Sequence, residues 1–441
     1  RITGDKLLDS VSEGLSYEGA KVVDCGMATT PAMFMSCVFE ETKFTGSVMV
    51  TASHLPFNRN GIKFFDINGG LDHADIAIIL EMAASIVVEK VDGGAGRSKF
   101  DLIGRYSKHL RTAICSSLGV SESEKPLSGL KIVVDSGNGA SGFFATDVLE
   151  PLGADTTGSQ FLEPDGMFPN HIPNPENGEA MEAIQNATVK NKADLGLIFD
   201  TDVDRMSAVL PDGSEINRDS IIALISAVLA KKYPGSTIVT DSVTSDRLTY
   251  FLEDVLHLKH FRFKRGYKNV IEKQIELNES GVVCPLAMET SGHGALSENY
   301  SLDDGAFLAV KIIIALAEAK KDGAGLGEFL EAFPKAVPGE EGEFRLKIRE
   351  EDFEDYGKKV LEEFKKRAVS KGYNLPENFE GVRLSFKGGD ARGWILLRLS
   401  LHDPVMPMNI EGERVGDLAK LKKIALELVS GFDKLDLQSL Q

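Results

Sequence analysis

The sequence has few cysteines, no excess of basic side chains and no long uninterrupted apolar run. Its four cysteines are scattered over 441 residues with no Cys-x-x-Cys pair, which indicates buried thiols in a reducing compartment. With 49 basic and 67 acidic side chains, the net charge is −18. That charge disfavours nonspecific nucleic-acid binding but permits a local basic pocket. No segment approaches the roughly 20 apolar residues of a membrane span. We therefore expect a cytoplasmic protein that binds neither nucleic acid nor membranes.

The opening RITGDK is not expected to be part of a signal peptide, because no apolar stretch follows it. Residues 5–26 read as a helix, a glycine turn and a strand. A chain rarely opens on a helix that feeds a parallel strand, so we expect that an earlier strand has been lost, and an organellar address could have been lost with it. The most apolar stretch, ADIAIILEMAASIVVEKV at residues 74–91, contains Asp75 and Glu81. We expect it to be a core-facing helix.

What the sequence does contain is a repeated alternation of helical and strand-like stretches. The chain is too long for one core, and three segments each run from an amphipathic helix through an apolar strand to a polar loop. Their strands and loops read AKVVDCG and GSVMVTASH, then GLKIVVDSGNGASG and ADLGLIFDTDVDR, then GSTIVTDSV and GVVCPLAMETSGHG. This alternation predicts three similar α/β domains with mixed, largely parallel sheets.

The C-terminal part of the chain follows a different pattern. A charged helix is expected near residues 350–370, and two β-runs around a glycine turn, GVRLSFKGGDARGWILLRLSLHDP, predict a hairpin. These elements indicate a smaller α+β domain. We place the domain boundaries near residues 107, 217 and 338. The resulting domains are 1–107, 108–217, 218–338 and 339–441.

Three aspartates end the second of these segments in the loop DTDVDR. On an extended chain, Asp200, Asp202 and Asp204 share one face. Two charges about 4 Å apart repel by roughly 4 kcal/mol at an effective dielectric near 20, so the group favours a cation such as Mg²⁺. An EF-hand is excluded because its sixth position would be Arg205 and its twelfth Pro211. The alternative is a solvated acidic loop without a ligand.

Residues 48–65, VMVTASHLPFNRNGIKFF, begin as a buried strand and continue as an exposed, shaped loop. The loop gathers Ser53, His54, Arg59 and Lys63 within a short stretch. Functional side chains concentrate in such loops at strand ends. The stretch is therefore a candidate site, although Arg59 can be merely exposed.

Two further loops carry polar side chains at a spacing of two. The loop METSGHG holds Glu289, Ser291 and His293, which suit sugar hydroxyls, although Glu-x-Ser is also common in helix caps. The loop RLSLHDP holds an arginine and two polar side chains that suit a phosphate, although on this stretch alone a surface turn before the proline is the favoured interpretation. The residues of this second loop are Arg398, Ser400 and His402.

The glycine-rich stretch VDSGNGASG, residues 134–142, has the Gly-x-Gly-x-x-Gly spacing of a dinucleotide-binding turn. That fingerprint also expects an acidic residue about 20 positions later at the end of a strand. Residues 155–163, DTTGSQFLE, do not form a clear apolar strand with such an end. A tight backbone turn is therefore the expected role of Gly137, Gly139 and Gly142.

Four of these loops, in this order, resemble those of the α-D-phosphohexomutase superfamily, the phosphomannomutase and phosphoglucomutase enzymes. TASHLP at 51–56 is similar to the family's Thr-Ala-Ser-His-Asn-Pro, and DTDVDR at 200–205 matches its Asp-x-Asp-x-Asp-Arg in full. METSGH at 288–293 and RLSLHDP at 398–404 are similar to Gly-Glu-x-Ser-Gly-His and Arg-x-Ser-Gly-Thr-Glu-Pro. Leu55, Met288 and residues 401–403 depart from these patterns. The resemblance covers nearly the whole chain.

The resemblance implies four domains around a central cleft and an enzyme that interconverts hexose 1-phosphates and hexose 6-phosphates of glucose, mannose or both. The reaction would pass through a phosphoserine at Ser53 and a hexose 1,6-bisphosphate. One Mg²⁺ would be bound by this phosphoserine together with Asp200, Asp202 and Asp204. The implied catalytic residues are Ser53, His54, Lys63 and Arg205. The implied substrate-binding residues are Glu289, Ser291, His293, Arg398, Ser400 and His402.

Two other functions remain open from the sequence. LGLIFDTDVD is similar to the nucleophile strand of haloacid-dehalogenase-type phosphatases, in which Asp200 would be phosphorylated. Such a strand usually opens its domain, whereas here nearly 200 residues precede it. The altered phosphate loop is also compatible with a non-catalytic protein that binds phosphosugars. As partners we expect a phosphorylated hexose substrate and either a monomer or a homodimer.

Overall fold

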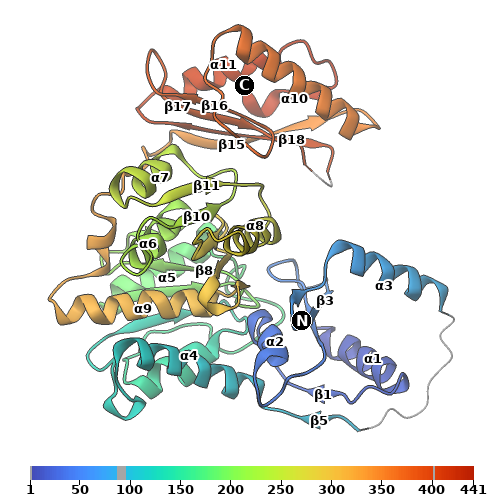
Figure 1. Cartoon of the computed structure of the whole chain (residues 1–441), viewed down its shortest axis with the longest axis vertical. Helices are drawn as coiled ribbons and strands as arrows, with labels where there is room; N and C mark the ends of the chain where they lie inside the picture. Colours follow the sequence, from blue (N-terminus) through green and yellow to red (C-terminus); the bar gives the residue numbers. More distant parts are fainter. Residues whose placement is uncertain (1, 87–95, 401–402) are drawn as a thin grey trace. The chain divides into compact units, whose positions relative to one another are not determined.

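The computed structural model describes residues 2–86, 96–400 and 403–441 (Figure 1). The chain forms two compact units. The first comprises Arg1–Val228 and Ser291–Phe329, and the second comprises Leu229–Thr290 and Leu330–Gln441. Both units combine helices with several separate sheets, so the predicted α/β class with a C-terminal α+β part is confirmed.

The first unit begins with the predicted helix, glycine turn and strand. Its N-terminal elements are α1 (Gly4–Tyr17), β1 (Val23–Asp24), α2 (Thr30–Val38), β2 (Ser47–Thr51), β3 (Gly61–Asp66), β4 (Gly69–Gly70), α3 (His73–Ser85) and β5 (Ser98–Lys99). β1 pairs in parallel with β5. β2 pairs in antiparallel fashion with β3, rather than with a parallel neighbour, because the loop between them closes a hairpin. This hairpin places Met49 opposite Lys63.

The helix predicted at residues 74–91 exists, but the expectation that it faces a core is wrong for its described part. Asp72 caps α3 by accepting the N–H of Asp75 at 2.9 Å. No residue of α3 is buried, and Ile78, Leu80 and Met82 are 57, 63 and 59% exposed. Apolar composition favours a helix here, but composition alone does not supply a surface to cover it.

The rest of the first unit is built around a four-stranded sheet of order β6-β7-β8-β9. β6 pairs in parallel with β7, as predicted, and the other two pairings are antiparallel. The residues of β7 and β8 are all buried, and α5 packs against β6 and β7. The remaining elements are α4 (Leu102–Leu118), η1 (Glu122–Glu124), β6 (Ile132–Asp135), η2 (Phe144–Leu149), η3 (Glu150–Leu152), α5 (Gly178–Asn191), β7 (Leu195–Phe199), β8 (Met206–Val209), β9 (Glu215–Ile216), α6 (Asp219–Ala230), β13 (Gly294–Leu296), η5 (Ser297–Asn299), β14 (Leu302–Asp303), α9 (Gly305–Lys321) and η6 (Leu326–Leu330).

The second unit contains a parallel set of strands in the order β11-β10-β12. This confirms the parallel pairing predicted for the third segment. Its elements are β10 (Thr237–Thr240), α7 (Asp246–Tyr250), η4 (Phe251–Val255), β11 (Lys259–Arg262), α8 (Tyr267–Glu279) and β12 (Leu286–Met288). Glu289 follows β12 directly, so it lies at the carboxyl end of these strands, where parallel sheets usually bind ligands.

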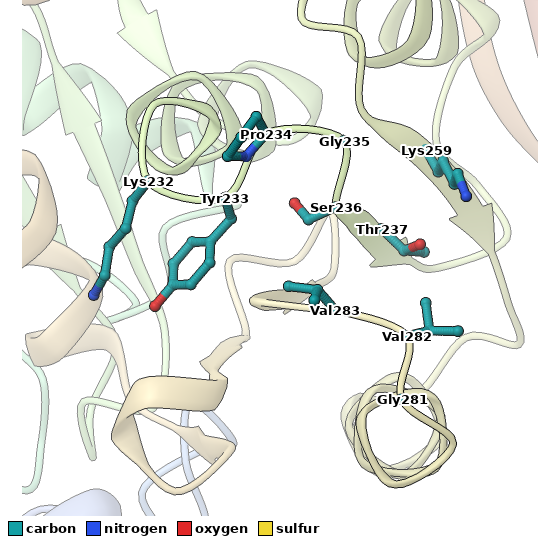
Figure 2. Close-up of a pocket in the computed structure, with 10 residues that line it drawn as sticks. All are labelled: Lys232, Tyr233, Pro234, Gly235, Ser236, Thr237, Lys259, Gly281, Val282 and Val283. Atoms are coloured by element: carbon teal, nitrogen blue, oxygen red, sulfur yellow. The ribbon is translucent and has the colours of Figure 1, made fainter.

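A cavity of about 470 Å³ lies at the opposite, amino-terminal ends of these three strands (Figure 2). Lys232, Ser236, Lys259 and Val283 are among its lining residues. None of the residues predicted for the site lines this cavity. Its position separates it from the loops expected to carry the chemistry.

The C-terminal part of the second unit is a five-stranded sheet of order β16-β17-β18-β15-β19, with antiparallel neighbours throughout. The predicted hairpin is confirmed as β16 and β17, and the predicted charged helix as α10. α10 and α11 cover one face of the sheet and enclose an apolar core (Figure 1). The elements are β15 (Glu341–Ile348), α10 (Phe353–Ser370), β16 (Val382–Phe386), β17 (Gly393–Leu397), β18 (Val405–Gly412), α11 (Asp417–Val429), β19 (Leu435–Asp436) and η7 (Gln438–Leu440).

The expectations for thiols and membrane helices have clear outcomes. All four cysteines are free; Cys37, Cys115 and Cys284 are buried as expected, whereas Cys25 is half-buried. Within the described parts of the chain, no helix has the length and apolar character needed to cross a membrane.

Candidate active site

The acidic loop connects β7 to β8 and is buried rather than solvated. Asp200, Asp202 and Asp204 are 0, 1 and 4% exposed. One carboxylate oxygen from each lies within 4.8 Å of the others. The turn is closed by the N–H of Asp200, which donates to the carbonyl of Arg205 at 3.2 Å, and Val203 adopts a left-handed φ of 68°. The structure therefore brings together the three carboxylates that the spacing predicted.

Asp202 is held by residues from the first hundred positions of the chain. Its Oδ2 accepts hydrogen bonds from Thr30 Oγ1 at 2.8 Å and Thr51 Oγ1 at 3.1 Å. The N–H of Thr30 also donates to the carbonyl of Asp202 at 2.9 Å. α2 and β2 thus fix the position of the acidic loop. Sequence reasoning missed Thr30, because a threonine at a helix start reads as a cap, a role that its neighbour Thr29 fills.

Lys63 lies in β3, the second strand of the β2–β3 hairpin, and bridges two of the aspartates. Its Nζ lies 3.0 Å from Asp202 Oδ2 and 2.9 Å from Asp204 Oδ2. Burial opposes the charge on this side chain, but the two carboxylates outweigh burial and raise the pKa of Lys63. An ammonium group at this place partly neutralises the cluster.

The donor set of the loop also fits a metal ion. Asp202 Oδ1 and Asp204 Oδ1 are buried, and neither oxygen has a hydrogen-bond partner among the described residues. A buried carboxylate oxygen without a partner carries a large desolvation cost. A hard divalent cation would satisfy both oxygens together with the carboxylate of Asp200. These residues could therefore hold a metal ion.

Ser53 lies beside this cluster in an unusual backbone conformation. Its φ is 45°, in the left-handed region that non-glycine residues seldom adopt. Such conformations are concentrated at functional sites. Ser53 Oγ donates to Asp200 Oδ2 at 2.9 Å and lies 3.3 Å from His54 Nδ1. The structure thus places the predicted serine against the predicted acidic loop, although 147 residues separate Ser53 from Asp200.

Arg205 connects the serine loop with the acidic loop. Its Nε and Nη2 donate to Asp200 Oδ2 at 3.3 and 3.2 Å, and Nη2 lies 2.6 Å from His54 Nδ1 and 3.3 Å from Ser53 Oγ. Because a guanidinium only donates, His54 Nδ1 is the acceptor and the proton of the neutral ring sits on Nε2. Burial and then the charge of Arg205 lower the pKa of His54. A neutral His54 results.

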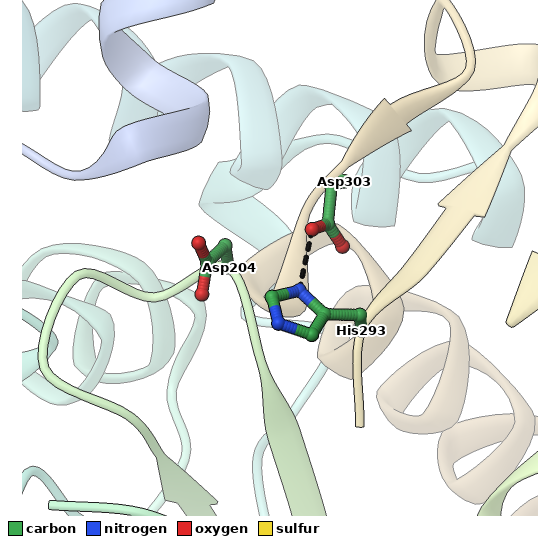
Figure 3. Close-up of side chains that lie close together, drawn as sticks. All are labelled: Asp204, His293 and Asp303. Carbon is green, nitrogen blue, oxygen red and sulfur yellow. Dashed lines mark hydrogen bonds and ion pairs between the residues drawn. The ribbon is translucent and has the colours of Figure 1, made fainter. Parts of the chain in front are cut away.

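His293 points toward the acidic loop (Figure 3). Its Nδ1 lies 2.5 Å from Asp303 Oδ2. Asp204, His293 and Asp303 each offer one atom that could bind a metal ion, and these atoms lie within 4.8 Å of one another. Burial opposes protonation, but Asp303 and Asp204 raise the pKa of His293 to about 9. Asp303 was missed by sequence reasoning, because the pair of aspartates before α9 reads as a helix cap, and Asp304 is that cap.

Glu289 and Ser291, predicted to read sugar hydroxyls, are buried at 4 and 8% exposure. Glu289 Oε1 accepts the N–H of Gly266 at 2.6 Å. The Oγ of Ser291 is buried and has no partner among the described residues. Ser291 therefore has unused hydrogen-bonding capacity, whereas one oxygen of Glu289 is already committed.

The loop predicted to bind phosphate begins where β17 ends. Arg398 is 8% exposed, and its guanidinium lies 3.6 Å from Glu380 Oε1 and 4.0 Å from Glu343 Oε2. Its Nε is buried without a partner among the described residues. Ser400 Oγ accepts the N–H of Asp403 at 3.2 Å. The predicted His402 lies outside the described residues.

Comparison with known proteins matches most of the chain to one family. Models of the phosphoglucomutase/phosphomannomutase alpha/beta/alpha domains I, II and III match residues 1–86, 104–213 and 217–336. A phosphomannomutase/phosphoglucomutase of Pseudomonas syringae is 30% identical over 437 residues, covering 97% of this chain and 86% of the relative. A phosphoglucosamine mutase of Caldicellulosiruptor saccharolyticus is 28% identical, covering 98 and 88%. A solved phosphoglucomutase/phosphomannomutase family structure from Burkholderia thailandensis aligns with a TM-score of 0.79 at 25% identity, covering 98 and 87%.

Proposed function

The chain belongs to the α-D-phosphohexomutase superfamily, and from this premise we propose that it interconverts hexose 1-phosphates and hexose 6-phosphates with Ser53 as the phosphoryl carrier. One observation carries the proposal. Ser53 Oγ lies 2.9 Å from Asp200 Oδ2, at the edge of a buried triad of carboxylates and within 3.3 Å of a guanidinium nitrogen of Arg205. A transferable phosphoryl group needs this combination of a hydroxyl carrier, a cation site and an arginine.

We propose that one Mg²⁺ is the resident cation. Asp200, Asp202 and Asp204 would hold it together with the phosphate on Ser53. The buried Oδ1 atoms of Asp202 and Asp204, which have no hydrogen-bond partner among the described residues, support this assignment. When bound, the cation would offset negative charge on the phosphoryl oxygens.

The chain's own residues would supply the remaining positive charge. A phosphoserine carries about −1.5 to −2 charges at neutral pH. Arg205 Nη2 already faces Ser53 Oγ and would donate to a phosphate there. Lys63, held beside the triad by two ion pairs, would add a second positive charge and serve in acid/base chemistry. His54 would donate through its protonated Nε2.

Transfer would occur in two balanced steps. In the first, the phosphoryl group on Ser53 passes to the free hydroxyl of a hexose monophosphate. The bond from phosphorus to Ser53 Oγ breaks as a bond to the sugar oxygen forms, and the hydroxyl proton is transferred to Ser53 Oγ, which gives a hexose 1,6-bisphosphate and a free serine hydroxyl. The bisphosphate then reorients, and Ser53 Oγ takes the other phosphoryl group. Closure of the site around this intermediate would exclude water.

We assign substrate binding to the two remaining loops. Glu289 and Ser291 would bind sugar hydroxyls, with the unpartnered Oγ of Ser291 as support, and His293 would act beside the acidic loop. Arg398, Ser400 and His402 would bind the non-reacting phosphate, with the unpartnered Nε of Arg398 as support. Relatives are named for glucose, mannose and glucosamine phosphates, and we propose glucose and mannose phosphates here. The predicted domain bounds, cytoplasmic location and monomeric or dimeric state stay predictions.

The test locates the phosphate. The protein is incubated with glucose 1,6-bisphosphate, and its intact mass and phosphopeptides are measured beside a coupled assay with glucose 1-phosphate. We expect one phosphate on Ser53, and neither phosphate nor turnover in Ser53→Ala. A hydroxylamine-labile acyl phosphate on Asp200 would instead indicate the phosphatase alternative. Absence of turnover from the unsubstituted chain would favour the non-catalytic binding protein.

A further inference from the structure

The glycine-rich turn that follows β6 packs against the acidic loop. The N–H of Ala140 donates to the carbonyl of Thr201 at 2.8 Å. A Cβ on Gly139 would lie 2.8 Å from both Cα and O of Thr201, so a side chain there would displace that backbone. Thr201 stands between two of the triad aspartates. The turn is therefore a support for the acidic loop rather than a nucleotide cradle.

The same turn also seats the segment PDGMFPNHIPNPEN, residues 164–177. A Cβ on Gly137 would lie 2.8 Å from Pro173 Cβ and 3.0 Å from His171 Cε1, so only glycine permits this approach. His171 Nε2 lies 3.0 Å from Asp135 Oδ1, and its Nδ1 lies 3.0 Å from the carbonyl of Ile172. Both ring nitrogens thus face acceptors, which favours the imidazolium form. The buried His171–Asp135 pair fixes the segment to the end of β6.

Asn174 lies three residues after this anchor and reaches Arg205. Its Oδ1 accepts a hydrogen bond from Arg205 Nη1 at 3.2 Å and another from the N–H of Glu176 at 3.0 Å. Glu176 Oε2 adds a longer ion pair with Nη1 at 3.9 Å. The hydrogen bond from the N–H of Glu176 is important, because it holds the Asn174 oxygen in place independently of Arg205.

These contacts leave the guanidinium of Arg205 little rotational freedom. Its Nε and Nη2 are bound to Asp200 on one side, and Nη1 is bound to Asn174 on the other. The edge bearing Nη2 is then directed at Ser53 Oγ. Without the Asn174 contact, Nη1 keeps only the longer ion pair with Glu176 at 3.9 Å, so the plane of the guanidinium is less firmly fixed on that side.

We propose that Asn174 is a positioning residue for phosphoryl transfer: seated by the glycine-rich turn, it orients Arg205 toward the phosphoryl group on Ser53. This inference rests on the proposed function of Ser53. Phosphoryl transfer depends mainly on positioning and on charge placed where it develops. Asn174 acts through Arg205 and would make no contact with the substrate.

Three variants test the inference. Asn174→Ala removes the acceptor, and Asn174→Asp keeps an acceptor oxygen at the same place. Asn177→Ala is the matched control, because Asn177 belongs to the same segment and caps α5 by accepting the N–H of Ala180 at 3.1 Å. For each variant kcat, KM, Tm and the single-turnover decay of phosphorylated Ser53 are measured with glucose 1-phosphate.

We expect Asn174→Ala to lower kcat and the decay rate on the order of tenfold, with little change in KM. Asn174→Asp should retain most of the rate. Asn177→Ala should lower Tm but leave kcat unchanged. The inference is overturned if Asn174→Ala matches the unsubstituted enzyme, if Asn174→Asp rescues nothing, or if Asn177→Ala lowers kcat equally. Inactivity of the unsubstituted chain would instead refute the proposed function.

Discussion

Replacing Lys63 by methionine should convert the acidic loop into a site that depends on divalent cations for its stability. The side chain of Lys63 is 31% exposed and makes ion pairs of 3.0 and 2.9 Å with Asp202 and Asp204, whose side chains are 2 and 5% exposed. Removing one partner of a buried ion pair costs about 3–5 kcal/mol. Because Lys63 is partly exposed, we take about 2–3 kcal/mol for Lys63→Met in the absence of metal.

Magnesium should restore most of this loss. A ligand present at 100 times its Kd stabilises the folded state by about 2.7 kcal/mol. Without the lysine, two carboxylate oxygens lose their positive partner, so the variant should gain more from Mg²⁺ than the unsubstituted protein does. Thermal unfolding with chelator and with a series of Mg²⁺ concentrations measures both effects. At about 2–4 °C per kcal/mol, the expected loss of Tm in chelator is roughly 4–12 °C.

The control is Lys43→Met, which breaks a surface ion pair with Glu40 whose side chains are 59 and 83% exposed. Such a pair contributes about 0–1 kcal/mol, so Tm should barely change in chelator or in magnesium. If Lys63→Met unfolds at the same temperature as the unsubstituted protein in chelator, the assigned role of Lys63 as counter-ion is incorrect. A magnesium response no larger than that of the unsubstituted protein would contradict the metal assignment of the loop.

Two further predictions concern the second unit. Arg398→Ala should raise KM for glucose 1-phosphate about 10- to 100-fold, because a charge-assisted hydrogen bond contributes about 1.5–3 kcal/mol. Phosphorylation of Ser53 should persist, and Arg345→Ala, whose side chain is 69% exposed, should leave KM unchanged. Burial and then Arg262 hold the pKa of His260 well below its usual 6.5. The unfolded state therefore binds more protons below pH 6.5, and stability should fall there by up to about 1.4 kcal/mol per pH unit. Urea unfolding should show a smaller fall for His260→Gln, and an identical pH dependence would refute this account.

The sequence predicted the two halves of the site for local reasons. The alternating aspartates follow an apolar strand, and this spacing predicts carboxylates on one face, although it left a solvated acidic loop as the alternative. Ser53 was found in the same way, as a polar residue in a loop at the end of β2. Both predictions concern residues within a few positions of each other, and over such short stretches the geometry of the chain allows few alternative arrangements.

The residues that complete the site could not be found in this way. Thr30, Asn174 and Asp303 each contact the acidic loop or Arg205 from elsewhere in the chain, and their types are common in caps and turns. Their roles depend on which elements pack together, which periodicity does not specify. The prediction that α3 faces a core was wrong for the same reason. Its apolar residues favour a helix, but they do not identify a surface against which the helix packs.

The hydrogen bonds of Asp202 also determine when the site can exist during synthesis. Its partner Thr30 is 172 residues away, and the ion pair of Lys63 with Asp204 spans 141 residues. At about 5–20 residues per second, the ribosome needs roughly 7–28 s to make that interval. Throughout this time the serine loop has been translated but its acidic partner has not. A nascent chain that ends before Asp204 therefore has the serine loop without the complete carboxylate triad. Under the proposed function, turnover must wait until Asp204 has been made.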